Sequence, residues 1–271
     1  MFAIPIASGS DCDEVTALDR LTMSQWLDQQ GFTSPRLRWL VDYSCRDDYG
    51  LTAEQTSAWA GIFYFASRSK QTSDASQEVI TWPEGNGRVV DYLGDCVASS
   101  LRRSHAVYDI HATKTTAPLV SAWDLNTDQA VGFQAEHVIF AAPQYLAPHL
   151  IRGFKVLPDR GVGEFQYGSW LVANVHLRER PLEGGMPMCW DNVIYQSQSL
   201  GYVASTHQTG RDHGPTVLTW YYPLTAQAGK VSRQQLLAMT WSEWCEIVVA
   251  DLQYAHRDIA DYITRLDIMR W

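Results

Sequence analysis

The sequence has few cysteines, and none of them are paired in a recognisable motif. The five cysteines, Cys12, Cys45, Cys96, Cys189 and Cys245, are dispersed, and no two form a C-x-x-C pair. An odd, scattered set favours reduced thiols over a disulfide framework. This weakly favours a cytoplasmic protein, although an export signal upstream of Met1 stays open.

Long apolar runs and basic blocks are also missing. No run is long enough for a transmembrane helix, and the N-terminal "MFAIPIASGSDCDE" lacks the basic region of a signal peptide. The formal net charge is -9, and the densest basic spot is only Arg102-Arg103. An acidic chain of this kind is a poor partner for nucleic acid or an anionic membrane. We therefore expect neither partner.

The usual hydrolase and metal motifs do not occur. The sequence contains no G-x-S-x-G and no H-E-x-x-H. His207 and His213 lie in a glycine-rich loop, without the second ligand pair that a zinc site needs. No metal site is predicted, and no catalytic residue can be assigned.

Apolar and aromatic residues are abundant. The chain has 271 residues, 46% of them hydrophobic, with 11 Trp and 13 Tyr. This is enough for a substantial core in one large domain or two small ones.

Helix signals dominate the first fifth of the chain. They are the capping boxes Thr22–Gln25 and Thr52–Gln55, the N-terminal pair Ser34-Pro35 and the terminating Gly50. Together they predict helices over "SQWLDQQ", over "RLRWLVDYSCRDD", and from Thr52 to Ala66.

Strand patterns dominate after Val79. Alternating segments include "AVYDIHAT", "PLVSAWDL", "QAVGFQAEHVIFAAP", "SWLVANVHL", "NVIYQSQSLGYVAST" and "PTVLTWYYPL". A long helix capped by Ser232 follows, and the chain closes on a strand-like run. This order predicts an α+β fold: a mostly helical N-terminal part, then an antiparallel or mixed sheet with flanking helices.

Two clusters allow a structural and a functional interpretation. In "DYSCRDDYG", Arg46 can pair with Asp42 one helical turn away, or Asp47 or Asp48 can hold a substrate ammonium group. The ion pair is the favoured interpretation.

In "EGNGRVV", Gly85 and Gly87 begin a G-x-G-x-x-G pattern, but the third position is Val90. We therefore interpret the turn as a strand-to-helix corner, not a phosphate cradle.

The segments "VITWPEGNGRVVDYLGD", "HAVYDIHAT" and "AEHVIFAAP", in this order, resemble the flavin-containing amine oxidase superfamily, which includes polyamine oxidases and phytoene desaturase-like enzymes. The resemblance covers about Thr81 to Pro143, and the ending "HRDIADYITRLDIMRW" also fits. It implies an FAD-dependent oxidoreductase that transfers hydride from a small organic substrate, such as an amine, to flavin. The family's N-terminal G-x-G-x-x-G segment is absent here.

The resemblance implies the internal, substrate-side region of a longer flavoenzyme. Residues 1–80 correspond to the helical part of a substrate domain, 81–143 partly to the FAD domain, and 144–271 to a mixed-sheet substrate domain. The chain alone is expected to be inactive and not to bind FAD tightly. Apolar surface left by the missing domain is expected to allow self-association.

The resemblance also implies which residues approach the cofactor. Val107 matches a valine whose main chain meets the adenine of FAD, Ala142 and Pro143 fall beside the cofactor, and Trp271 matches an aromatic position near the flavin. Strand aromatics, among them Tyr202, Trp220 and Tyr221, either line a substrate pocket or pack in the core, and core packing is the favoured interpretation. The alternative is a stand-alone, cofactor-free binding or interaction domain.

Overall fold

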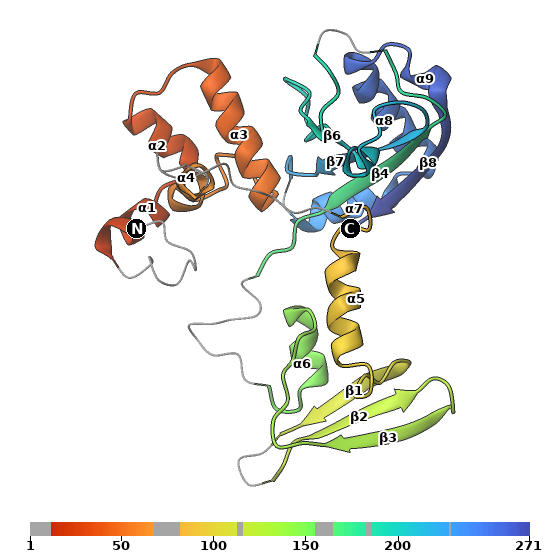
Figure 1. Ribbon diagram of the computed structural model, residues 1–271. Coiled ribbons are helices and arrows are strands. Elements are labelled where there is room, and N and C mark those ends of the chain that lie inside the picture. The colour runs from red at the N-terminus through yellow and green to blue at the C-terminus, as the bar shows by residue number, and fades with distance from the viewer. Residues whose placement is uncertain (1–11, 68–81, 113–115, 155–164, 183–185, 228) are drawn as a thin grey trace, which may run out of the picture. The chain divides into compact units, whose positions relative to one another are not determined.

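The computed structural model describes residues 12–67, 82–112, 116–154, 165–182, 186–227 and 229–271 (Figure 1). Its contacts divide the chain into two compact units. Unit 1 comprises residues 1–85 and 167–271, and unit 2 comprises residues 86–166. The described residues form helices and two antiparallel sheets, so the predicted α+β class is confirmed. The predicted division into an FAD part and a substrate part stays a prediction.

The first helices of unit 1 begin where their caps place them. These helices are α1 (Asp13–Asp19), α2 (Met23–Gln29), α3 (Pro35–Tyr49) and α4 (Ala58–Ala66). Thr22 and Gln25 form the predicted capping box of α2, and the Ser34 hydroxyl accepts from the Leu37 amide at the start of α3. Gly50 ends α3 in the left-handed conformation, with φ 63°. Local sequence therefore sets these boundaries.

The predicted start of the next helix, at Thr52, is wrong. The Gln55 side chain does accept from the Thr52 amide, but the segment closes only a single turn. The helix α4 begins at Ala58, where the Ser57 hydroxyl accepts from the Ala60 amide, and it ends at Ala66 as expected. Ser57 is the cap because the turn before it does not continue into the helix.

The N-terminal helices share a small core. Met23 and Leu27 of α2 pack with Val41 and Cys45 of α3 and with Ala53 of the following turn. Gly61 of α4 lies against Met23, and a Cβ at position 61 would come within 2.6 Å of the Met23 sulfur. This close approach leaves room only for glycine on that face of α4.

The main element of unit 1 is a five-stranded sheet in the order β5-β6-β7-β4-β8. Its strands are β4 (Trp170–Leu177), β5 (Asp191–Asn192), β6 (Tyr202–Ala204), β7 (Thr216–Pro223) and β8 (Ile263–Arg270), and the 3-10 turn η4 (Ser205–Thr209) follows β6. All four pairings are antiparallel. Side chains of β4 alternate between half-buried and buried along its whole length, as expected for a strand with one face on the core.

The late helical region consists of two helices where the sequence predicted one. These are α7 (Gly229–Ala238) and α8 (Trp241–Ala255), and the short α9 (Ile259–Tyr262) follows. Thr240 and Glu243 form a complete capping box that starts α8. Ser232, the predicted cap, lies inside α7, where its hydroxyl donates to the Gln227 carbonyl.

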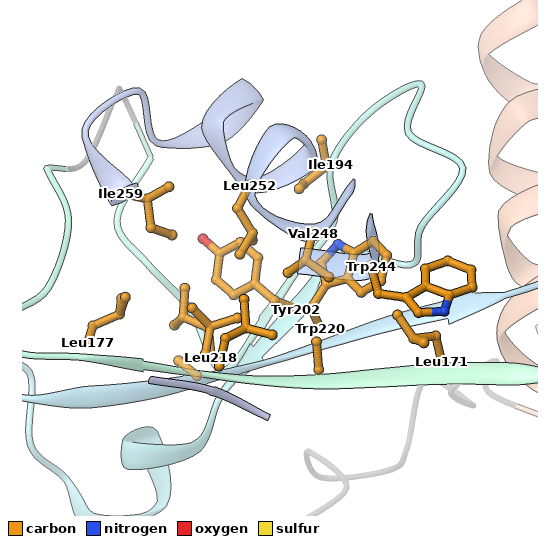
Figure 2. Close-up of a cluster of buried hydrophobic side chains, with 14 of the residues drawn as sticks. Leu171, Leu177, Ile194, Tyr202, Leu218, Trp220, Trp244, Val248, Leu252 and Ile259 are labelled. Atoms are coloured by element: carbon orange, nitrogen blue, oxygen red, sulfur yellow. The ribbon is translucent and has the colours of Figure 1, made fainter. Parts of the chain in front are cut away.

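One face of the sheet carries the large core of unit 1 (Figure 2). Leu171 and Val175 of β4 and Leu218 and Trp220 of β7 contribute from the sheet, and α8 covers them. The buried side chains of α8 are Trp244, Val248 and Leu252, spaced at four residues. This spacing puts them on one helical face, which is the packing that holds the sheet together.

Unit 2 contains the helix α5 (Gly87–Cys96), the strands β1 (His105–His111), β2 (Leu119–Asp124) and β3 (Gln129–Gln134), the 3-10 turn η2 (Gln144–Leu146) and α6 (Ala147–Leu150). The strands form an antiparallel sheet in chain order, and residues 125–128 join β2 to β3. Ile110 bridges to Ile151 beside α6, and Arg152 pairs with Asp109 at 2.9 Å. Few residues of this unit are buried, notably Ile110, Ala122 and Ala147.

The predicted strand over residues 135–143 is wrong. The ladder of β3 ends at Gln134, and residues 135–143 have no regular secondary structure. The apolar pattern is that of a strand, but no strand partner for it lies among the described residues. The strand expected at Val79–Thr81 lies outside the described residues.

Candidate functional site

The candidate site lies on the face of the five-stranded sheet opposite the α8 core, which we call the outer face. The strand register places Asp191, Val203, Thr219, Asn174 and Asp267 in one row across all five strands. A second row on the same face contains Tyr221, Val172 and Met269. Each of these residues is half-buried or exposed. The outer face is therefore a mixed polar and apolar surface that remains open among the described residues.

Polar side chains on the outer face hold one another in place. The Thr219 hydroxyl donates to Asn174 Oδ1 at 2.9 Å. Asp267 accepts from Arg265 Nε at 2.8 Å and lies 3.1 Å from His176 Nε2. The hydrogen bond from Arg265 is the main cause of a pKa of Asp267 below its ordinary value. This end of the outer face is thus a satisfied network around an ionised carboxylate.

Aromatic rings of α3 border the other end of the outer face. Trp39 meets Tyr195 edge-on with centroids 4.7 Å apart, and it stacks on Tyr43 at 5.7 Å. The Tyr43 hydroxyl is directed at the Leu200 carbonyl, 3.4 Å away. Burial is the largest cause of a strongly raised pKa of Tyr43, followed by the negative charge of Asp47. Tyr43 is therefore a neutral phenol at physiological pH.

Asp191 is the carboxylate whose charge acts on both Tyr43 and Tyr221. Partial loss of hydration raises the pKa of Asp191. Its negative charge contributes to the raised pKa of both Tyr43 and Tyr221, although burial is the larger cause for each. A partly dehydrated carboxylate beside aromatic faces attracts an organic cation more strongly than a fully hydrated one does. This corner is suited to recognising a protonated amine.

A buried arginine fixes the segment beside the corner. Arg46, with a side chain only 3% exposed, donates to Asp42 Oδ2 at 3.0 Å and to the Gln198 carbonyl at 2.7 Å. The predicted pairing of Arg46 with Asp42 is confirmed. It serves to join α3 to the loop at residues 197–201. The suggestion of an ammonium site at Asp47 or Asp48 stays a prediction.

Asp251 of α8 also holds the loop at residues 197–201, through hydrogen bonds to its carboxylate. Its carboxylate accepts from the Ser197 and Ser199 hydroxyls at 2.6 Å each and from Trp220 Nε1 at 2.7 Å. Gly201 follows with φ 83°, and a Cβ at that position would come within 2.0 Å of the Asn192 carbonyl oxygen. The loop that carries Tyr195 toward α3 is therefore held by charge and by backbone geometry.

Sequence patterns did not reveal Asp191 or Asp251 as important. Both lie in segments with ordinary composition, and their partners are distant in the chain, such as Tyr43 for Asp191 and Ser197 for Asp251. Of the aromatics that could line a pocket or pack in the core, Tyr202 and Trp220 are core residues, while Tyr221 lies on the outer face. Register alone decides between these positions, and a single strand pattern does not give the register.

The four residues implied to contact a cofactor are divided between the two units. Val107 lies on β1 and is 39% exposed, and the exposed Ala142 and Pro143 precede η2, all in unit 2. Trp271 directly follows β8 in unit 1 and is 67% exposed, with its backbone hydrogen-bonded to Trp170. Nothing tests their role, so all four assignments stay predictions.

The turn at residues 85–87 leads directly into α5. Gly85 has φ 59°, which explains the glycine at this corner. The amides of Val89 and Val90 in the first turn of α5 already donate to the Asn86 carbonyl. These bonds are those of an ordinary helix start. The expectation that this chain alone does not bind FAD tightly stays a prediction.

The described residues contain no helix long and apolar enough to cross a membrane. They also contain no cluster of His, Cys, Asp or Glu side chains able to hold a metal ion.

Comparison with solved structures finds a putrescine oxidase and a cyclohexylamine oxidase among the similar folds. A putrescine oxidase bound to putrescine matches with a TM-score of 0.67 and 11% identity, covering 95% of this chain and 55% of that one. Cyclohexylamine oxidase from Brevibacterium oxydans matches with a TM-score of 0.55 and 14% identity, covering 96% and 55%. A protein from Pyrococcus furiosus matches with a TM-score of 0.57 and 11% identity, covering 94% and 61%.

At these identities the likeness shows the fold and nothing finer. The chain spans about half the length of the two oxidases that it matches. No protein-family model matches the sequence, and no match is found among curated proteins.

Proposed function

We propose that this chain is the substrate-side part of an FAD-dependent oxidoreductase of the amine oxidase type. In the complete enzyme, a small organic substrate, such as an amine, would give up hydride to flavin. The observation that carries the proposal is the likeness in fold to two amine oxidases over 95% or more of this chain. The ordered motifs around Gly85, Val107 and Ala141 support it independently.

The role of this chain would be to bind and orient the substrate. The outer face offers apolar side chains such as Val172 and Met269 and the aromatic corner around Tyr43 and Tyr221. An enclosed apolar surface excludes water from a redox centre, and a carboxylate such as Asp191 neutralises a bound ammonium group. The redox chemistry itself would be supplied by FAD held mainly outside these residues.

The test uses the polypeptide encoded by the complete reading frame that contains these 271 residues. It should be yellow, with flavin absorbance near 450 nm, a general property of flavins. Adding candidate amines without oxygen should bleach that absorbance, because the flavin is reduced. The 271-residue chain alone, prepared in parallel with excess FAD, should stay colourless after gel filtration. A complete polypeptide that carries no flavin would refute the proposal and favour a cofactor-free binding domain.

A further inference from the structure

A groove lies where the end of α7, the start of α8 and the last residues of β8 meet. Its volume is about 400 Å³, and its lining includes Leu237, Ala238, Trp241 and Trp244 from the helices and Ile268 and Arg270 from β8. Ligand pockets have volumes of about 300–1,000 Å³, so the groove is large enough for a small molecule. Ile268 and Arg270 pair with the buried Ala173 and Leu171 of β4. The groove therefore lies on the α8 side of the sheet, opposite the outer face.

A change of helix forms one wall of the groove. The helix α7 ends at Ala238, and Thr240 caps α8 almost directly after it. The Glu243 carboxylate accepts from the Thr240 amide at 2.7 Å and from its hydroxyl at 2.8 Å. The polar groups of this corner are thus used by the cap, and the carboxylate is held at the start of the helix.

The two tryptophans of this wall have their polar groups satisfied inside the protein. Trp241 Nε1 donates to the Leu266 carbonyl at 3.2 Å, and Trp244 Nε1 donates to the Leu236 carbonyl at 3.4 Å. What these indoles offer to a ligand is therefore carbon surface. Trp241 is 58% exposed and Leu237 is 50% exposed. An apolar ligand body that covered both side chains would remove this surface from water.

Arg270 supplies a positive charge without a protein counter-charge. It is exposed, and its one hydrogen bond among the described residues runs from Nη1 to the Leu237 carbonyl at 3.3 Å. No described carboxylate pairs with it, and no described Asp or Glu lines the groove. An arginine without such a partner is notable in a chain with 30 acidic and 21 basic residues. The guanidinium has five N–H donors in a geometry that matches a carboxylate.

We propose that this groove binds a small organic carboxylate that has an apolar body. The carboxylate accepts hydrogen bonds from the Arg270 guanidinium, and the body lies against Trp241 and Leu237. Charge complementarity selects this class of ligand, because a cation would be repelled by Arg270 and a neutral ligand would gain no charge-assisted bond. The site is separate from the surface to which we assign the amine, so it does not depend on the proposed function.

The test measures binding to the 271-residue chain by isothermal titration calorimetry. The probes are octanoate and octan-1-ol, which have the same hydrocarbon body and differ in the carboxylate. We expect saturable binding of octanoate and binding of octan-1-ol that is about tenfold weaker or more, because the alcohol lacks the charge-assisted hydrogen bonds.

Two variants and a control locate the ligand. Arg270→Gln should weaken octanoate binding about tenfold or more and leave octan-1-ol unaffected, because only the carboxylate loses bonds. Arg265→Gln is the matched control: Arg265 lies on the same strand but pairs with His176 on the outer face, so octanoate binding should not change. Ala238→Phe should abolish the binding of both probes, because the ring fills the groove from an exposed position.

Four results would overturn the inference. They are no saturable octanoate binding, equal affinity for the two probes, equal effects of Arg270→Gln and Arg265→Gln, and a parent chain whose self-association is lost in Ala238→Phe. The last would mean that a second copy fills the groove. Thermal unfolding followed by circular dichroism shows whether each variant folds. If Ala238→Phe does not fold, the comparison of Arg270→Gln with Arg265→Gln decides, because both of these side chains are exposed.

Discussion

Removing the Arg46 guanidinium should loosen the junction between the N-terminal helices and the five-stranded sheet. Arg46→Met retains much of the buried stem but removes the bonds to Asp42 Oδ2 at 3.0 Å and to the Gln198 carbonyl at 2.7 Å. A third contact, to the Ser199 carbonyl at 3.5 Å, is too long to contribute much.

The expected loss can be estimated from these contacts. Hydrogen bonds to a charged group contribute about 1.5–3 kcal/mol each, and breaking a buried ion pair costs about 3–5 kcal/mol. The cost of leaving Asp42 without its arginine partner is reduced, because the Asp42 side chain is 35% exposed and keeps a hydrogen bond from the Ala53 amide. We therefore expect the free energy of unfolding to fall by about 2–4 kcal/mol.

Urea unfolding followed by tryptophan fluorescence measures this loss. The matched control is Arg38→Met, which breaks an ion pair with Asp28 on the surface of the same helical region. That side chain is 31% exposed and its partner 66%, so the control should lose less than about 1 kcal/mol. If Arg46→Met loses no more than the control, the buried guanidinium does not join the two parts and our reasoning is wrong.

Three further predictions concern the loop and the aromatic corner. Asp251→Ala should lower the free energy of unfolding by about 3 kcal/mol in urea titrations, since three donors lose their acceptor. Gly201→Ala should lower the Tm far more than Gly210→Ala, because only the first methyl group meets backbone, at 2.0 Å. Burial raises the pKa of Tyr43 in the folded protein. The free energy of unfolding should therefore fall as the pH rises above about 10, where the tyrosine of the unfolded chain ionises. Tyr43→Phe should reduce that fall in urea titrations at alkaline pH.

Each of these has a contrary outcome. An Asp251→Ala variant as stable as the parent would mean that water replaces the carboxylate. An equal fall in Tm for Gly201→Ala and Gly210→Ala would mean that the backbone near Asn192 moves to accommodate the added methyl group. If Tyr43→Phe loses as much unfolding free energy at alkaline pH as the parent does, groups other than Tyr43 cause that loss.

The sequence predicted those features that depend on neighbouring residues. The Thr22 box, the Ser34 cap and the left-handed Gly50 each act within about one turn, so a local pattern identifies them. The helix predicted from the Thr52 capping box is wrong because that local pattern forms only a single turn. The helix itself begins later, at Ala58.

The features that the sequence could not predict depend on distant partners. The order β5-β6-β7-β4-β8 and the hydrogen bonds of Asp251 are set by segments tens of residues apart. The predicted strand over residues 135–143 shows the converse, since a strand pattern gives no ladder when its partner is missing from the described residues. The candidate site belongs to this second group, because the register of five strands decides which side chains share the outer face.

The position of β4 in the sheet has a consequence for how the chain folds. Trp170–Leu177 lies between β7 and β8, and both of these strands come later in the sequence. During synthesis, β4 therefore leaves the ribosome with neither neighbour available, and it acquires its second neighbour only when Ile263–Arg270 has been made. Pairings of this kind close long loops and form slowly. One side of β4 is thus an aggregation-prone edge until residues 263–270 emerge, and dependence on chaperones should be greatest before that stage.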